Sequence, residues 1–208
     1  MLSGSQPEPQ AGRTSSPAPR RRADARRNVE ALIEAAGGVF ATSGVDAPAK
    51  EITDRAGVGV GTLYRHFPQR ADLVKAVVES GIDAVADAGP ALSAEREPAE
   101  ALSAWVYRFA ELLGTKRGLA SALHSGDPAF EGLPGYFTQR LGPALATLLD
   151  AAVAAGTVRD DIGAEDLLPA ITALCQPVTG RGPEHNQRIV AVFLDGLRCG
   201  ATRQPSTS

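Results

Sequence analysis

Apolar residues recur along most of this chain with the period of an α-helix. Between Asp24 and Ser43 they follow the spacing i, i+3, i+4, i+7 that places them on one helical face, and Gly44 is expected to end that helix. These apolar positions are Val29, Leu32, Ile33, Ala36, Val39 and Phe40. No convincing alternation of apolar and polar residues predicts a strand, so we expect an all-α fold.

Residues 48–57, with the sequence PAKEITDRAG, predict a second helix. Pro48 suits its first turn, where a missing N–H costs nothing. Ile52 and Ala56 lie four residues apart and are therefore expected on its inner face. Gly57 can adopt a positive φ, which ends the helix and turns the chain.

A very short third helix is expected between this turn and Pro68, which cannot continue a helix. So few residues do not form a stable helix alone, because nucleation is costly. Val58 and Leu63 are the apolar residues expected to hold it against the second helix. Its polar side chains, Thr62, Tyr64, Arg65 and His66, then point outward. A small helix held in this way, after a tight glycine turn, is how a helix-turn-helix enters a DNA groove.

A fourth helix is expected from about Gln69, with Asp72 near its start, where a carboxylate suits the helix dipole. The segment 87–98, DAGPALSAEREP, is expected to be a loose connection to the rest of the chain. Further helical stripes of apolar residues follow between residues 102 and 197. The prolines expected to kink or end these helices are Pro143, Pro169 and Pro177.

The ends of the chain differ in composition from the rest. Residues 1–22 hold four prolines among serines, glycines and glutamines, and they are expected to be a disordered tail because they have almost nothing to bury. The arginines at 20–22 either contact DNA, along phosphates or in a minor groove, or belong to a solvated tail. Residues 203–208 are expected to be a frayed tail.

Charge is unevenly distributed along the 208 residues. Residues 1–80 carry 11 Lys+Arg and 9 Asp+Glu, whereas the remainder carries 10 and 15. The small basic excess coincides with the outward-facing polar helix, while phosphate would repel the acidic remainder.

Several classes of protein are disfavoured by the sequence. No run approaches the roughly 20 apolar residues of a membrane span, and the N-terminus lacks the apolar region of a secretory signal. We therefore expect a cytoplasmic protein without a membrane partner. Cys175 and Cys199 have no metal-binding spacing and are expected to be buried thiols. The three histidines form no HxxxH pair, so neither a metal nor a cofactor is expected.

Catalytic patterns are also missing from the sequence. There is no GxSxG motif and no evident pairing of a Cys nucleophile with a His base. The acidic pairs at 160–161 and 165–166 fit a turn and a first helical turn better than a catalytic carboxylate pair. The glycine-rich run 57–61 lacks a preceding strand and the GxGxxG spacing of a nucleotide-binding loop. We expect that this protein is not an enzyme.

Residues 26–77, RRNVEALIEAAGGVFATSGVDAPAKEITDRAGVGVGTLYRHFPQRADLVKAV, closely resemble the DNA-binding domain of TetR-family transcriptional regulators. The specific core is AGVxxGTLYxHF, and the resemblance extends over residues 26–85. Residues 102–200, with DLL at 166–168 and DGLR at 195–198, resemble the SbtR-like type of C-terminal domain. The resemblance implies an N-terminal three-helix DNA-binding domain at 26–85 and an all-helical ligand-binding and dimerisation domain at 86–202.

Particular DNA contacts are implied by the same resemblance. Lys50, near the start of the second helix, and Arg70, opening the fourth, match positions that contact phosphate. Tyr64 and His66 also match phosphate-contacting positions. Ala49 departs from the family, because many members have a Ser or Thr there that hydrogen-bonds a phosphate. The leading end of the recognition helix comprises Gly59, Val60, Gly61 and Thr62.

The side chains of this helix suggest how it would meet DNA. Val60 offers apolar contact suited to a thymine methyl, Gly61 lets the backbone come close, and Thr62 can donate or accept a hydrogen bond. Arg65 is the only side chain of the helix able to form a bidentate pair with guanine. Whether Arg65 contacts a base or a phosphate remains open.

The resemblance further implies a homodimer that represses genes by blocking a palindromic operator in double-stranded DNA, and we expect an unknown small-molecule effector to release it. The last two long helices of each subunit are expected to form a four-helix bundle at the dimer interface, with Ile171, Phe193 and Leu197 in it. Aromatic candidates for the effector pocket are Trp105, Phe109, Tyr136 and Phe137, each of which is equally consistent with ordinary core packing. An alternative function is that of a helical small-ligand-binding protein with a vestigial DNA-reading head, and Ala49 is its only support.

Overall fold

A computed structural model describes residues 19–115, 126–176, 178 and 180–199. Among these residues there are eight α-helices, one short 3-10 helix and no strand, which confirms the all-α prediction. The elements are α1 (Pro19–Ser43), α2 (Ala49–Ala56), α3 (Val60–His66), α4 (Arg70–Glu95), α5 (Pro98–Thr115), η2 (Pro128–Phe130), α7 (Leu133–Ala154), α8 (Ala164–Leu174) and α9 (Pro183–Cys199).

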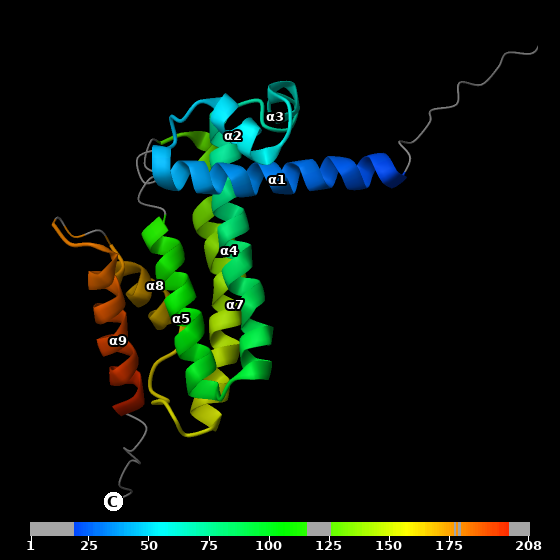
Figure 1. Ribbon diagram of the computed structural model, residues 1–208. Coiled ribbons are helices and arrows are strands. Elements are labelled where there is room, and N and C mark those ends of the chain that lie inside the picture. The colour runs from blue at the N-terminus through cyan, green and yellow to red at the C-terminus, as the bar shows by residue number, and fades with distance from the viewer. Residues whose placement is uncertain (1–18, 116–125, 177, 179, 200–208) are drawn as a thin grey trace, which may run out of the picture.

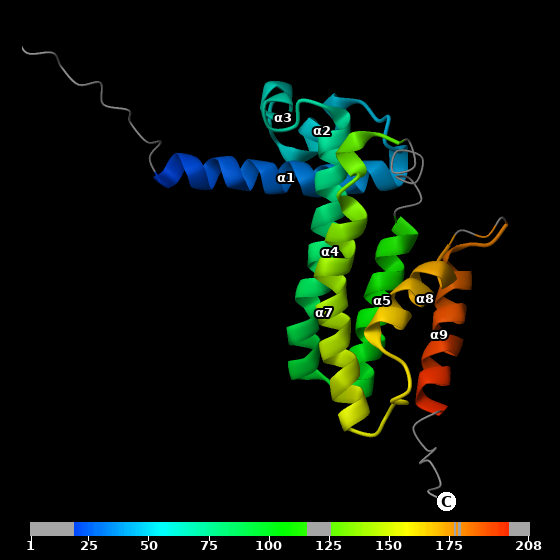
Figure 2. The ribbon, with the colours of Figure 1, turned by 180° about the vertical axis from the view of Figure 1, so that it is seen from behind.

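The helices form two parts, which we call the head (α1–α3) and the body (α4–α9). In Figures 1 and 2, α1 lies across one end of the body, and α2 and α3 sit on the side of α1 that faces away from it. Helices α4, α5 and α7 run alongside one another down the body, with α8 and α9 beside them. The recognition helix α3 is thus carried at the far end of the molecule.

Apolar residues from all three helices of the head, and from α4, hold it together. Leu32, Phe40 and Ile52 are almost fully buried, as are Leu63 and Leu73. Val58, which precedes α3, is partly buried against the same core. The sequence-based prediction that Val58 and Leu63 anchor α3 is therefore consistent with the packing.

Helix α4 joins the head to the body without a break. Its start carries a capping box in which the backbone N–H of Gln69 donates to Asp72 Oδ2 at 3.0 Å. It continues through Pro90 to Glu95, so the expected loose connection at 87–98 is wrong. Tertiary packing overrides the proline, because the flanking Gly89 and Leu92 are buried and Gly89 lies against α7.

Two further prolines also lie inside helices. Pro143 is within α7 and Pro169 is within α8, so neither ends its helix, while Pro177 lies outside the described residues. Each leaves the carbonyl four residues earlier without a helical partner. Those carbonyls belong to Gln139 and Glu165, which are exposed residues. Because water can take the place of the missing donor, the helices continue.

Helix α1 begins at Pro19, five residues before its predicted start at Asp24. The last four residues of the predicted tail, 19–22, are therefore helical. Residues 1–18 and 200–208 lie outside the described residues, as do the predicted C-terminal tail and most of the predicted N-terminal tail.

Candidate nucleic-acid interface

Helix α3 has one buried face and one exposed face. Leu63 and Phe67, four residues apart, are buried against the head. The opposite face is exposed, with Tyr64 54% and Val60 40% accessible. Thr62 and His66 lie between the two faces and are partly buried. The exposed residues of α3 are Val60, Gly61, Tyr64 and Arg65, which we call the α3 face.

Local hydrogen bonds fix the direction in which the α3 face points. Gly57 ends α2 in the left-handed conformation with φ 68°, as predicted. The next N–H, that of Val58, donates to the Thr53 carbonyl at 3.1 Å. Gly59 then caps α3 in an extended conformation, and its carbonyl accepts from the Thr62 N–H at 2.8 Å. These bonds fix the start of α3, and the burial of Leu63 and Phe67 holds the rest of it, so the helix keeps one orientation on the head.

The glycine at position 61 is not required by the fold. A Cβ atom added there would meet nothing within 4 Å, and the residue has no positive φ. Glycine inside a helix is less favourable than alanine by up to about 1 kcal/mol. Since nothing in the described subunit requires this residue, an external surface that approaches the backbone closely is a physical reason for it.

Lys50 projects from α2 and is engaged only by its own helix. Its Nζ donates to Asp54 at 2.7 Å, and the side chains are 76% and 63% exposed. Exposed pairs of this kind contribute little to stability. Lys50 can therefore exchange the carboxylate for a phosphate, and its predicted DNA contact stays a prediction.

Arg70 has a structural role that the sequence did not reveal. Its Nε donates to the Val45 carbonyl at 2.6 Å and its Nη2 to the Ala47 carbonyl at 2.5 Å. The guanidinium also lies over the Phe40 ring, 4.8 Å from its centre, and burial lowers the pKa of Arg70. Arg70 thus braces the loop between α1 and α2. Only Nη1 of Arg70 is left for the predicted phosphate contact, because Nε and Nη2 already donate to carbonyls. That contact stays a prediction.

The four predicted effector-pocket residues have different environments. Trp105 and Phe109 are fully buried, and the Trp105 Nε1–H donates to the Val85 carbonyl at 2.9 Å. Their rings pack in sequence with that of Phe137, with centroids 5.7 and 5.6 Å apart. Only Phe137 also lines a described cavity, a volume of about 780 Å³ between α7 and α8. Trp105 and Phe109 are therefore core residues in this structure, rather than residues that line the cavity.

Tyr136 belongs to a polar cluster between α7 and α4. The Tyr136 hydroxyl donates to Asp83 Oδ1 at 2.7 Å, and this bond raises the pKa of Tyr136 above its ordinary value. Arg140 donates to Asp83 at 2.6 Å and to Asp87 at 2.8 Å. We call these four residues the α4–α7 cluster. No local pattern of residues indicates this cluster, because its partners on α4 and α7 are more than 50 residues apart.

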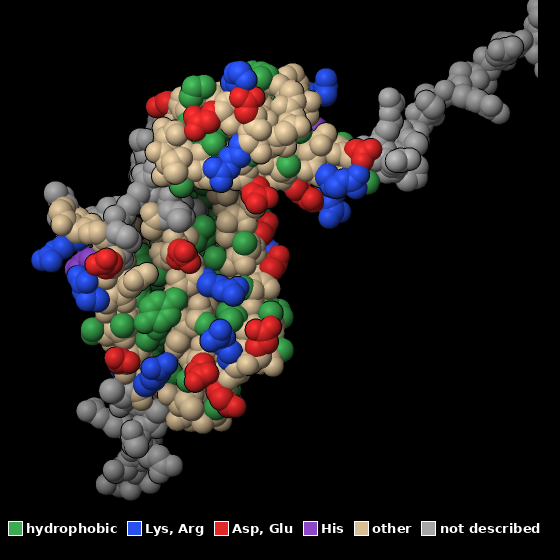
Figure 3. Space-filling model, viewed as in Figure 1, with side chains coloured by type: hydrophobic (Ala, Val, Ile, Leu, Met, Phe, Trp, Pro, Cys, Tyr) green, Lys and Arg blue, Asp and Glu red, His purple; other side chains and the backbone are tan. Residues whose placement is uncertain are grey.

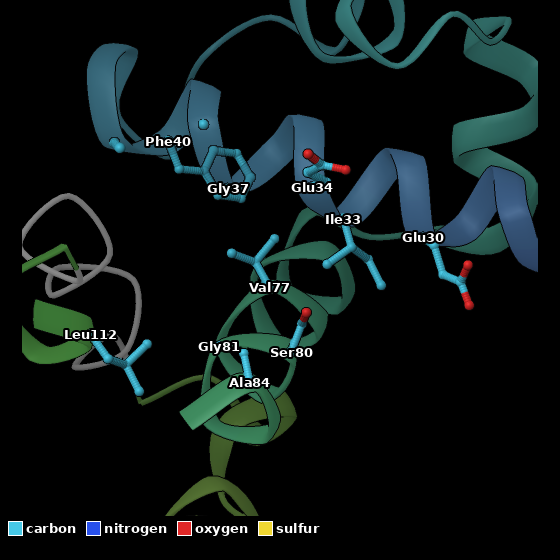
Figure 4. A pocket seen from close by; sticks show the side chains of 12 residues that line it. Glu30, Ile33, Glu34, Gly37, Phe40, Val77, Ser80, Gly81, Ala84 and Leu112 are labelled. Carbon is cyan, nitrogen blue, oxygen red and sulfur yellow. The ribbon is translucent and has the colours of Figure 1, made fainter. Parts of the chain in front are cut away.

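Another cavity, of about 560 Å³, lies where the head meets the body (Figure 4). Its walls come from α1, α4 and α5, with Ile33, Val77 and Leu112 among its apolar lining and Glu30 and Glu34 on the α1 side. Gly81 of α4 lies against Leu112 of α5, since a Cβ added at Gly81 would lie 2.6 Å from Leu112 Cδ1. Any reorientation of the head must change the shape of this cavity.

The predicted dimer residues mostly face the interior of the subunit. Ile171 is fully buried and Leu197 is 4% exposed, so both are packed in the subunit's own core. Phe193 is partly buried and is the only one of the three with appreciable area for a partner. On the described part of α9, the large apolar side chain that is exposed is Val192, which is 69% accessible. The helical spacing of apolar residues did not predict it as a dimer residue.

Within the described residues, no three His, Cys, Asp or Glu side chains are grouped to hold a metal ion. Cys175 is a buried free thiol, as predicted, and burial raises its pKa. The side chain of Cys199 is not among those described. No helix in the described part of the chain is both long enough and apolar enough to cross a bilayer.

Comparisons with known proteins match both parts of the chain. Residues 32–77 match the bacterial regulatory proteins of the tetR family, and residues 97–199 match the C-terminal domain of SbtR-like transcriptional regulators. HTH-type transcriptional regulators of Staphylococcus aureus are 36% identical over 63 residues, which is 30% of this chain and 34% of theirs. The chain therefore spans about a third of the length of these curated relatives.

Two solved structures match over nearly their whole length. A TetR transcriptional regulator of Streptomyces coelicolor has a TM-score of 0.69 and 37% identity, covering 82% of this chain and 98% of that one. A TetR transcription regulatory protein of Mycobacterium vanbaalenii has a TM-score of 0.68 and 35% identity, covering 86% and 99%. The likeness thus includes the body as well as the head.

Proposed function

Because the chain belongs to the TetR family of transcriptional regulators, we propose that it is a repressor whose homodimer blocks a palindromic operator and is released by a small-molecule effector. DNA-binding regulation is common to the family, and homodimers that respond to ligands are typical of it. For this protein we propose three specific features: that it represses transcription, that its operator is palindromic, and that a small-molecule effector releases it.

The observation that supports DNA reading most directly is the α3 face. Four exposed residues lie on one face of a helix that Leu63 and Phe67 hold against the head and that lies at the end of the molecule. Residues at the leading end of such a helix meet base edges, while flanking groups contact phosphates. In this arrangement Val60 and Gly61 enter the groove first, with Tyr64 and Arg65 one turn behind.

A homodimer supplies the second copy of the α3 face that a palindrome requires. The two heads must enter successive major grooves, which lie roughly 34 Å apart along one face of the duplex. We place the subunit contact on α8 and α9, with Phe193 and Val192 as the apolar side chains that retain exposed area. A two-fold contact of this type presents the same residues from both subunits.

Selection of duplexes from a random pool by the purified full-length protein tests this function. The expected product is an inverted repeat, bound on the order of 10³-fold more tightly than a scrambled duplex of the same length, with binding that weakens as salt is raised. Absence of any preferred duplex would overturn the proposal. That result would favour the alternative of a ligand-binding protein with a vestigial head, in which Ala49 marks a lost phosphate contact.

We place the effector in the cavity between α7 and α8, because that cavity is largely apolar and lies against α7, the helix that also carries Tyr136 and Arg140 of the α4–α7 cluster. Phe137 and Thr138 line the cavity, and their neighbours Tyr136 and Arg140 bind α4 at Asp83 and Asp87. A ligand that displaces α7 therefore also displaces the middle of α4, through the bonds to Asp83 and Asp87. Since α4 continues unbroken into the head, its movement changes the separation of the two α3 faces. A displacement that carries one head out of its groove releases the dimer.

Replacing Arg140 with glutamine is expected to uncouple effector from operator. An effector found by screening small apolar molecules for loss of operator binding should weaken wild-type binding at least about tenfold. The Arg140→Gln variant should bind the operator and the effector as before but lose most of that response, because α7 no longer holds α4 through two carboxylates. Operator affinity would be titrated with and without effector.

Arg159→Gln is the matched control for this prediction. Arg159 is also a partly exposed arginine bound to a carboxylate, but its partner Asp161 lies two residues away in the α7–α8 connection. It should respond to the effector like the wild type. If Arg140→Gln retains the full response, the α4–α7 cluster does not carry the coupling.

A further inference from the structure

None of residues 23–28, in the first turns of α1, is fully buried. Buried residues of α1 begin at Leu32, and the side chains of Asp24, Arg26 and Arg27 are exposed. Figures 1 and 2 both show this end of α1 projecting beyond α2, α3 and the body. At 1.5 Å per residue, residues 19–28 extend about 15 Å. We call residues 19–28 the arm.

The arm is strongly basic. Residues 20–27 include five arginines, at positions 20, 21, 22, 26 and 27, and one acidic residue, Asp24. Figure 3 shows Lys and Arg side chains gathered towards this end of α1. Arg26 and Arg27 are 83% and 67% exposed. No other described segment of similar length in this chain has such a charge excess.

The existing partners of these arginines do not compete strongly with an external anion. Arg26 is bound to Glu30 and Arg27 to Asp24, both on the same helix and both exposed. Exposed ion pairs within a helix contribute little to stability, because water screens them. A guanidinium can therefore exchange such a carboxylate for a phosphate, to which it can donate two parallel hydrogen bonds.

Binding to an anionic surface would also stabilise the helical conformation of the arm. Helical turns without tertiary packing are marginal, and like charges one turn apart destabilise them further. A row of phosphates removes that repulsion. In both ribbon views the arm projects on the side of the head where α3 lies, so a duplex docked on the α3 face passes close to it.

We propose that the arm binds the phosphate backbone of DNA beside the groove that α3 enters. This inference rests on the proposed function and adds a second, sequence-independent contact to it. Arg26 and Arg27 are the described residues that carry the contact. Because phosphates are the same at every base pair, the arm contributes affinity and salt dependence, while the α3 face supplies the discrimination between sequences.

The test is the salt dependence of binding by the full-length dimer carrying Arg26→Gln and Arg27→Gln together. Each lost phosphate contact lowers the slope of log K against log salt by about 0.9, and the dimer loses two such contacts in each subunit. The double variant should therefore show a slope smaller by about 3.6. Affinity at low salt should fall at least about tenfold for the operator and for a scrambled duplex alike. The ratio of the two affinities should stay unchanged.

Arg96→Gln with Arg108→Gln is the matched control. Both are exposed arginines of the body, and Arg96 lies at the end of α4 that is remote from the head. This control should keep the wild-type slope. A wild-type slope in the Arg26/Arg27 variant, with operator preference intact, overturns the arm and leaves the proposed function standing. A wild-type protein with no preference for any duplex overturns both, and a changed preference ratio in the variant overturns the phosphate-only role.

Discussion

Replacing Leu63 with alanine is expected to lower the free energy of unfolding of the head by about 2–5 kcal/mol, the usual cost of removing a buried leucine side chain. Leu63 is 3% exposed and is the residue through which α3, seven residues long, reaches the core of the head. A helix of this length has too few hydrogen bonds to persist once its packing is lost. Operator affinity should therefore fall at least about tenfold, because only the fraction of molecules with α3 in place can bind.

The measurement is denaturant unfolding followed by circular dichroism, together with operator titration of the same preparations. Leu63→Met is the matched control, because it preserves volume and should cost less than about 1.5 kcal/mol. Helicity of the body should persist in both variants, since Leu63 does not contribute to it. Wild-type stability and operator affinity in Leu63→Ala would contradict the view that this residue holds α3 in position.

The head was largely predictable from sequence because its signals are local. Gly57 was expected to end α2 with a positive φ and does so at 68°, and the carboxylate of Asp72 was expected at the start of α4 and forms part of its capping box. The period of the apolar residues also separates the buried and exposed faces of α3. Each of these inferences depends on neighbours within one helical turn.

The rest of the fold depends on contacts between distant parts of the chain. The segment 87–98 was expected to be a loose connection, yet α4 continues through Pro90 to Glu95 because Gly89 and Leu92 are packed in the body. Arg70 matched a phosphate-contacting position, but its donors reach carbonyls more than 20 residues away. Helical periodicity identifies an apolar face without saying what covers it. From sequence alone, Ile171 could belong either to a dimer interface or to the core of its own subunit, and the structure shows it buried in that core.

A second large effect is expected at Gly61, where leucine should reduce operator affinity at least about tenfold without weakening the fold. A side chain added at this position meets no atom of the described subunit, so it projects from the α3 face into solvent. In a complex it would occupy the space through which the backbone of α3 approaches the base edges. Helix propensity favours leucine over glycine, so the free protein should be as stable as the wild type or slightly more so.

The matched control for this prediction is Gly135→Leu in α7. Gly135 is also an exposed glycine in the first turn of a helix, with nothing within 4 Å of an added Cβ, and it belongs to α7 rather than to α3. The substitution should leave operator affinity unchanged. Any loss common to both variants would be a general effect of adding leucine to the surface.

Whether the α3 face enters a DNA groove is therefore tested most directly by the operator affinity of Gly61→Leu, titrated alongside a measurement of its free energy of unfolding. If the α3 face enters the groove, the affinity falls at least about tenfold while the free energy of unfolding stays the same or rises by up to about 1 kcal/mol. Wild-type affinity in this variant would mean that α3 does not approach DNA through the α3 face, and the proposed manner of reading DNA would be wrong.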